Sequence, residues 1–304
     1  MASAVDYVQA SNRQTIPAPS DTATPEYRDF LDAAATIPAD RLDGYRLYED
    51  YYDGEHETRL TDRAREYLEQ NGLTWSENFC EPVIDVLAER LRVTGFATQN
   101  DDLDAWCAEM WQRNRMDAVQ CTVHATALIK GEAYALLDWD DELKRPIVAF
   151  NRPEIINCHY AEGNDTIEWA AKVWDTDATG PANPNGKAIC RLNIYRADRI
   201  EKWFRLQQGG KGGWAPWVDA EGETISWWTD TGEEGGEPRG VPVVSFRNRP
   251  LGRAQGRSEM RGTVPQNDLL NKLVLDLAMI LDNQAWQQRW ATGIDPTNAS
   301  FKNA

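Results

Sequence analysis

The chain has 304 residues, and its 49 acidic residues against 32 basic residues give a formal net charge of −17. Because so acidic a protein repels nucleic acid over most of its surface, any contact with DNA must use a restricted region. No stretch reaches the length of about 18 uncharged apolar residues that a membrane-spanning helix requires, and we expect no secretory signal at the N-terminus. Five scattered cysteines without a CxxC pair predict buried free thiols in a reducing compartment.

Helical patterns follow a polar N-terminal segment. Residues 1–24 lack periodicity, so we expect a mobile arm there. Residues 25–71 predict helices that stop at Gly72. Residues 78–95 predict another helix, ended by Gly95, with one apolar stripe made of Val83, Val86, Leu87 and Leu91.

Two more helices are predicted before the pattern changes. Asp101 or Asp102 is expected to cap the first, and the second covers residues 116–130 and ends at Gly131. The hydrophobic period then changes from 3.6 to 2. Residues 132–150 predict two strands around an acidic turn, and further strands at 166–176, 188–206 and 241–248 continue one antiparallel sheet. The sequence therefore predicts an α+β fold with a helical N-terminal part and a hairpin-rich antiparallel sheet.

A long helix closes the pattern. Thr263 and Gln266 fit a capping box, and a helix over 263–291 is predicted. Its apolar residues recur at helical spacing, which predicts packing against partner helices in the same chain or in a neighbour. This stripe comprises Leu270, Leu273, Val274, Leu277, Ile280, Leu281 and Ala285, and Trp286 and Trp290 near its end suit subunit contacts. We divide the chain into an arm at 1–24, an α+β body at 25–250, and an arginine-rich connector with the long helix at 251–304.

Positive charge gathers just before this helix. Residues 239–304 hold nine Lys/Arg and five Asp/Glu, so the rest of the chain carries a net charge of −21. One interpretation is a solvated connector whose arginines pair with acids of the same or an adjacent subunit. The other is a positive rim that touches nucleic-acid backbone without reading bases. The residues concerned are Arg247, Arg249, Arg253, Arg257 and Arg261, with Lys272 on the helix itself.

Motifs for catalysis are missing from the sequence. It contains no Walker loop, GxSxG or HExxH motif, and we expect no enzyme activity, no cofactor and no metal. Cys121 and His124 share a helical face but lack a second ligand pair. The acidic turn could suggest a metal-dependent hydrolase, although its spacing favours a solvated turn over a cation site; its acids are Asp138, Asp140, Asp141 and Glu142.

Several segments in a fixed order resemble a known family. They are YYDGEH at 51–56, the segment 78–96, the segment 125–160 with KGEAY before the acidic hairpin, and the segment 241–294 with GRSEMRG and RWATG around the long helix. This order resembles the portal proteins of tailed bacteriophages, of the SPP1-type family found in phages of actinobacteria. The resemblance covers roughly residues 40–294 and lies in the combination, since no single motif is specific.

The resemblance implies a structural protein rather than a catalyst. Portal proteins form a ring, usually of twelve subunits, at one capsid vertex, and double-stranded DNA enters and leaves through it. The implied partners are double-stranded DNA, a terminase, scaffold or major capsid protein and head-completion proteins. The implied location is the virion, with the bacterial cytoplasm during assembly. The body would be the wing of such a protein and the helix at 263–291 a stem helix near the channel.

Two points remain open at the level of sequence. Family members continue beyond RWATG with a clip, a second stem helix, a tunnel loop and a crown, so we expect the 304 residues to be a truncated product or a portion. A different head-assembly or adaptor protein with the same α+β body is the alternative structural role.

Overall fold

The computed structural model describes residues 25–285, apart from 57–61, 73–76, 141, 162–165, 178–187, 207–212, 220–221 and 252–254. The expected mobile arm at 1–24 lies outside this part of the chain. The described residues form a mixed helical and antiparallel structure, which confirms the α+β prediction. Of the helices described, none has the length and apolar character needed to cross a membrane.

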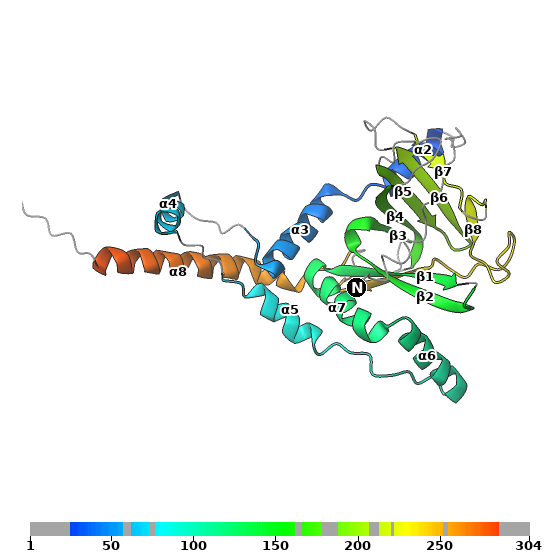
Figure 1. The fold of residues 1–304 in the computed structure, drawn as a ribbon, viewed down its shortest axis with the longest axis horizontal. Coiled ribbons are helices and arrows are strands. Elements are labelled where there is room, and N and C mark those ends of the chain that lie inside the picture. Colours follow the sequence, from blue (N-terminus) through cyan, green and yellow to red (C-terminus); the bar gives the residue numbers. More distant parts are fainter. Residues whose placement is uncertain are drawn as a thin grey trace, which may run out of the picture.

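Among the residues that the structure describes, six helices precede the sheets (Figure 1). They are α2 (Pro25–Ala34), α3 (Ala39–Asp53), α4 (Asp62–Asn71), α5 (Cys80–Ala88), α6 (Asp101–Arg113) and α7 (Met116–Lys130). The helix predicted at 116–130 is confirmed, since α7 has these bounds. Its predicted end is confirmed too, because Gly131 follows it in the left-handed conformation with a φ of 90°.

Helices α5 and α6 differ from their predictions. Helix α5 ends at Ala88 instead of Gly95, and it buries Cys80 and Ile84. The predicted apolar stripe, made of Val83, Val86, Leu87 and Leu91, is exposed. Asn100 caps α6 instead of an aspartate, because its side-chain oxygen accepts the N–H groups of residues 102 and 103.

The strands form two sheets, whereas the sequence predicted one. The first has the order β2-β1-β9 and the second β3-β4-β5-β6-β7, with β8 paired to β6. A 3-10 turn, η1 (Pro153–Ile155), separates β2 from β3 and redirects the chain into the second sheet. The bounds are β1 (Glu132–Asp140), β2 (Arg145–Asn151), β3 (Ile156–Tyr160), β4 (Ile167–Asp177), β5 (Ala188–Tyr195), β6 (Arg199–Leu206), β7 (Ala215–Pro216), β8 (Ile225–Trp227) and β9 (Val243–Arg247).

Both faces of the second sheet are covered. Helix α2 packs Leu31 and Ala34 against Leu192 and Ile194 on one face. The opposite face meets the first sheet through a second cluster of buried residues: Tyr134, Leu136, Ile156, Tyr195, Ile200 and Val243. The body is therefore a sandwich of two sheets with a helix on its outer side.

A buried carboxylate fixes α3 to the first sheet. Glu132, which is 2% exposed, pairs with Arg41 at 2.6 Å and accepts a hydrogen bond from Tyr134 Oη at 2.8 Å. It also accepts a hydrogen bond from Tyr45, and burial together with this negative charge raises the pKa of the Tyr45 hydroxyl. The position of α3 on the body thus depends on a fully partnered ion pair.

The cysteines are free, as predicted, but only some are buried. Cys80 and Cys190 are buried, Cys107 and Cys158 are intermediate, and Cys121 is exposed. The prediction of five buried thiols is therefore wrong for Cys121, which lies on a solvent-facing side of α7.

The long helix α8 (Val264–Ala285) extends away from the body (Figure 1). One residue, Thr263, separates it from the 3-10 turn η3 (Glu259–Gly262). Thr263 is itself helical, with φ −82° and ψ −38°. An N-cap residue has non-helical dihedrals, so the predicted capping role of Thr263 is wrong. Residues 286–291 of the predicted helix lie outside the described residues, and so do Trp286 and Trp290.

Candidate subunit interface

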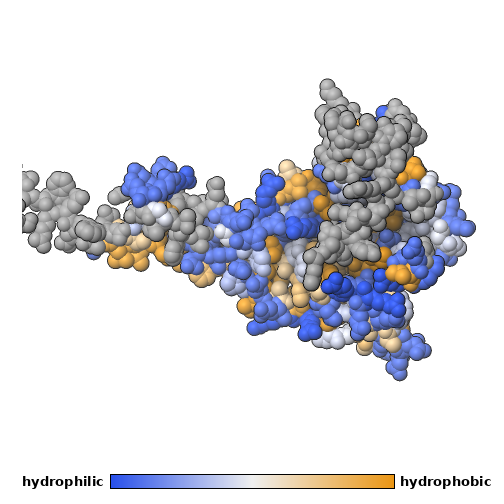
Figure 2. All heavy atoms as spheres, viewed as in Figure 1, coloured by the Kyte–Doolittle hydropathy of each residue, from blue (hydrophilic) through white to orange (hydrophobic). Residues whose placement is uncertain are grey.

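The apolar stripe of α8 faces solvent. Leu273 and Leu277 are each 55% exposed, and Leu281 is 58% exposed. Figure 2 shows this apolar surface along the projecting rod, with hydrophilic α4 on its other side. A surface helix normally turns its apolar stripe toward the core. The exposed residues of this stripe, with Leu269 beside it, are Leu269, Leu270, Leu273, Leu277, Ile280 and Leu281, and we call them the α8 face.

The side of α8 that the same chain covers is largely polar. Asn267 and Asn271 are 2% and 1% exposed, although their type is usually found at the surface. Leu275 is also buried there, and it contacts Leu68 of α4. Helix α8 thus buries amides and exposes leucines, the reverse of what a helix in an isolated globular protein does.

The two asparagines attach α8 to the segment before α5. Asn271 Oδ1 accepts the N–H of Glu77 at 2.9 Å, and its Nδ2 donates to the carbonyl of Glu77 at 2.9 Å. Asn267 Oδ1 accepts the N–H of Phe79 at 3.0 Å. These side chains replace the backbone partners that residues 77–79 would find in a helix or a sheet. The direction in which α8 leaves the body is therefore set by amide hydrogen bonds.

An aromatic pair completes this attachment. The ring of His56 stacks on Tyr51 at 4.1 Å, and its Nε2 lies 3.2 Å from Asn267 Nδ2. Burial lowers the pKa of His56, which favours a neutral ring that can accept from the amide. Tyr51 Oη donates to Oδ1 of Asp268, the residue after Asn267 on α8, at 2.6 Å.

Replacing Asn271 by alanine is expected to loosen the base of α8. The change removes both hydrogen bonds that Asn271 makes to the backbone of Glu77, each worth about 0.5–1.5 kcal/mol. We expect amide hydrogen exchange in residues 264–275 to accelerate at least about tenfold, with little change in the sheets. Asn100→Ala, which removes an exposed cap of α6, is the control and should leave α8 unchanged. Equal acceleration in both variants would contradict the role given to Asn271.

A second exposed apolar surface lies on α5 and the segment after it. Val86 is 51% exposed, Leu91 is 44% exposed and Phe79 is 47% exposed. Contiguous apolar surface of this kind marks an interaction site. The exposed residues, called the α5 face below, are Phe79, Val83, Val86, Leu87, Leu91, Val93 and Phe96. The sequence analysis identified the stripe of α5 but not its exposure, because periodicity does not show what covers an apolar side.

The arginines before α8 do not form one cluster. Arg247 on β9 lies over the ring of Tyr160 at 4.7 Å, and Arg249 pairs with Glu259 at 2.6 Å. Both therefore contact groups of the same chain, but of these two contacts only that of Arg249 is with an acid, the kind of partner that the solvated-connector interpretation names. Arg257, Arg261 and Lys272 are exposed, and Arg253 lies outside the described residues.

The described residues offer no metal centre. No group of three or more His, Cys, Asp or Glu side chains among them could hold a metal ion. In the acidic turn, Asp140 Oδ1 accepts the N–H groups of Glu142 and Leu143, which is the geometry of a turn, and Asp141 lies outside the described residues. Burial lowers the pKa of His124, the partner of Cys121 on α7.

Comparisons with known proteins point in one direction. No protein-family model matches the chain. The chain is 25% identical over 225 residues to the portal protein of Mycobacterium phage D29, in a match that covers 70% of this chain. The chain spans 41% of the length of that relative. The chain is thus distantly similar to a phage portal protein.

Proposed function

We propose that the chain is a subunit of the portal vertex of a tailed bacteriophage, where copies form a ring that double-stranded DNA crosses during packaging and ejection. The single observation that supports this most is the exposed α8 face, because leucines at 55% exposure need a partner to leave water. The distant similarity to a phage portal protein supports a further copy of the same chain as that partner.

The geometry of the exposed surfaces favours a ring over a simple dimer. A two-fold dimer uses one patch on both subunits, whereas a cyclic head-to-tail assembly needs two different patches on each subunit. The α8 face and the α5 face are two such patches on different elements. In the proposed ring, the α8 face of one subunit packs against the α5 face of the next. A ring of twelve is the form that the family resemblance implies.

Charge assigns different roles to different surfaces. The acidic body repels DNA, and a channel must let DNA slide without holding it. Exposed Arg257, Arg261 and Lys272 are then the cations that meet either phosphate groups or the acids of the neighbouring subunit. A terminase, scaffold or major capsid protein and head-completion proteins are the further partners proposed. The location is the capsid vertex in the virion and the host cytoplasm during assembly, and the role is structural, without a catalytic step.

Ring formation can be tested by mass and by imaging. Sedimentation of the 304-residue chain over a hundredfold range of concentration, at low and high salt, should give a large closed oligomer. Negative-stain images of that species should contain rings with a central hole. High salt should preserve the rings, because apolar contact supplies most of the binding. A chain that remains monomeric at every concentration and salt would contradict the proposal.

A further inference from the structure

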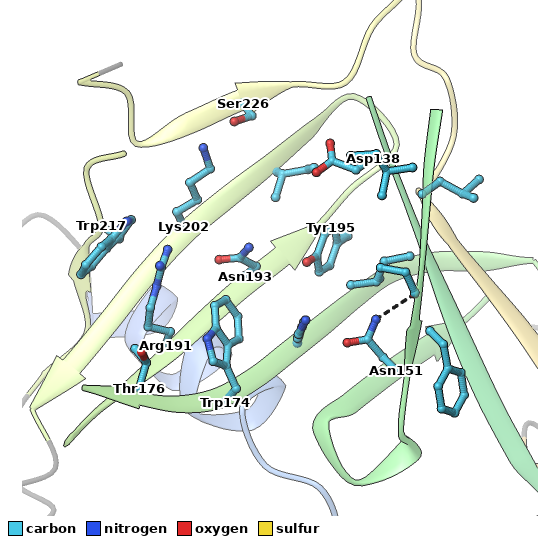
Figure 3. A pocket seen from close by; sticks show the side chains of 17 residues that line it. Asp138, Asn151, Trp174, Thr176, Arg191, Asn193, Tyr195, Lys202, Trp217 and Ser226 are labelled. Atoms are coloured by element: carbon cyan, nitrogen blue, oxygen red, sulfur yellow. Dashed lines mark hydrogen bonds between the residues drawn. The ribbon is translucent and has the colours of Figure 1, made fainter. Parts of the chain in front are cut away.

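A cavity of about 290 Å³ lies between the two sheets of the body (Figure 3). One wall comes from β1 and β2, and the other from the face of β4, β5 and β6 that turns away from α2. The inner faces of such a sandwich are normally apolar. Here, the second wall carries cations, amides and tryptophans.

Strand register brings the cations together. Lys172 of β4 lies directly opposite Asn193 of β5, and Asn193 lies directly opposite Lys202 of β6. Arg191 is two residues from Asn193 on the same face, opposite Trp174 of β4. Three basic side chains therefore surround one asparagine, although each comes from a different strand.

Only one of these three cations has a carboxylate partner. Lys202 Nζ pairs with Asp219 Oδ2 at 2.5 Å. In the part of the chain that the structure describes, Lys172 and Arg191 have no ion pair, and their close contacts are with aromatic rings. The guanidinium of Arg191 lies 3.9 Å from the ring centroid of Trp217 and 5.1 Å from that of Trp174.

Two polar atoms at the same place lack partners. Arg191 Nε and Asn193 Oδ1 are buried, and neither has a hydrogen bond among the described residues. Such atoms in a native structure require an explanation, and an unfilled ligand site is one. The Asn193 amide can turn to present its NH₂ group, so that a ligand at this point finds donors from Asn193, Arg191 and Lys172.

Burial makes these two charges costly. Burial, and secondarily the charge of Arg191, lowers the pKa of Lys172 to about 8. Burial lowers the pKa of Arg191 to about 10. Like charges in a partly desolvated site repel each other strongly, and an anion between them removes both the repulsion and part of the desolvation cost.

We propose that this cavity binds a small dianionic oxyanion of the phosphate class at the end formed by Arg191, Lys172 and Asn193. The charge of the ligand follows from the two cations without carboxylates, since Asp219 already neutralises Lys202. Asp138 also lines the cavity, but it lies at the opposite end from Arg191 and Trp217, next to Tyr195 (Figure 3). The proposal does not depend on ring assembly.

Titration calorimetry with inorganic phosphate and with sulfate, at constant ionic strength set by chloride, tests this site. We expect one site per chain with a dissociation constant of about 1 mM or tighter. Lys172→Met and Arg191→Gln should each weaken binding at least tenfold. Arg113→Gln removes an exposed charge of α6 remote from the cavity and should leave binding unchanged. Absence of binding up to about 10 mM in the unmodified chain, or equal weakening by Arg113→Gln, would overturn the proposal.

Thermal unfolding supplies a readout that does not rely on heats of binding. Sulfate should raise the unfolding temperature of the unmodified chain more than chloride does, and this difference should be clearly smaller in Lys172→Met, where only the general effect of sulfate remains. Lys172→Met is expected to fold, because it replaces an unpaired buried charge by an apolar side chain of similar size. An equal effect of sulfate on both proteins would assign it to general salt stabilisation and overturn the site.

The pH dependence adds a specific signature. Arg191 and Tyr195 on β5, Lys202 on β6 and Asp138 on β1 are the titratable groups that line the cavity with Lys172. Sulfate stays dianionic between pH 7 and 9, so its affinity should fall above about pH 8 as free Lys172 loses its proton. The same series on Lys172→Met should be flat, and a flat series on the unmodified chain would contradict the assignment of Lys172.

Discussion

Replacing Leu273 or Leu277 by aspartate is expected to dissociate the assembly into folded monomers. Each leucine is 55% exposed in the single chain, so the monomer loses little packing when it is changed. In the proposed interface, each leucine contributes about 1–1.5 kcal/mol through burial of the half that is still exposed, and an unpaired carboxylate there adds a desolvation cost of several kcal/mol. Together these terms should weaken each subunit contact at least about a thousandfold, which sedimentation at fixed concentration will measure.

A matched control separates this effect from general surface chemistry. Leu143 in the turn between β1 and β2 is also 55% exposed, but it lies on neither the α8 face nor the α5 face. Leu143→Asp makes the same chemical change at the same exposure and should leave assembly intact. If Leu143→Asp dissociates the assembly as strongly as Leu277→Asp does, or if neither does, the α8 face is not the interface.

Mixing two defective variants tests whether the contact is head-to-tail. Val86→Asp damages the α5 face, and Leu277→Asp damages the α8 face. Each variant alone should be monomeric, but an equal mixture retains one good copy of each face and should form dimers that grow no further. A two-fold contact between two α8 faces predicts instead that Val86→Asp alone still forms dimers, because its α8 face is intact, and this result would contradict the head-to-tail arrangement.

Local sequence patterns predicted the elements better than they predicted what covers them. The helix at 116–130 and the hairpin at 132–150 follow from periodicity and from Gly131, and the structure has both. The leucine spacing on α8 was also read correctly, but periodicity measures only that one side is apolar. Whether that side meets its own chain is decided by tertiary contacts, here by Asn267 and Asn271, which take the buried side instead.

The division into two sheets and the cation site both depend on contacts distant in sequence. Strand β9 pairs with β1 across more than a hundred residues, and no local feature of 241–248 identifies that partner. Lys172 and Arg191 each alternate with apolar neighbours on a separate strand, a pattern typical of a strand with one solvent face, and Lys202 lies between Glu201 and Trp203. Only the register places them around Asn193 on an inner face.

Gly131→Ala is expected to destabilise the body severely. Gly131 has a φ of 90°, which L side chains rarely adopt, and an added Cβ would lie 2.9 Å from the backbone of Gly256 and Arg257. Its carbonyl also accepts the N–H of Asn248 at 2.8 Å, so the backbone cannot move away without losing a hydrogen bond. Strain and displacement together should lower the free energy of unfolding by about 3 kcal/mol or more.

The same substitution at Gly44 provides the opposite expectation. Gly44 lies within α3, and a Cβ there meets nothing within 4 Å. Alanine should therefore stabilise the chain by up to about 1 kcal/mol, because it favours the helix. Denaturant titrations of both variants measure the difference.

The close approach of residues 256–257 to Gly131 holds the connector that leads into α8 against the end of α7. If the free energy of unfolding of Gly131→Ala differs by less than about 1 kcal/mol from that of the unmodified chain, the approach is not tight and the connector does not fix the position of α8.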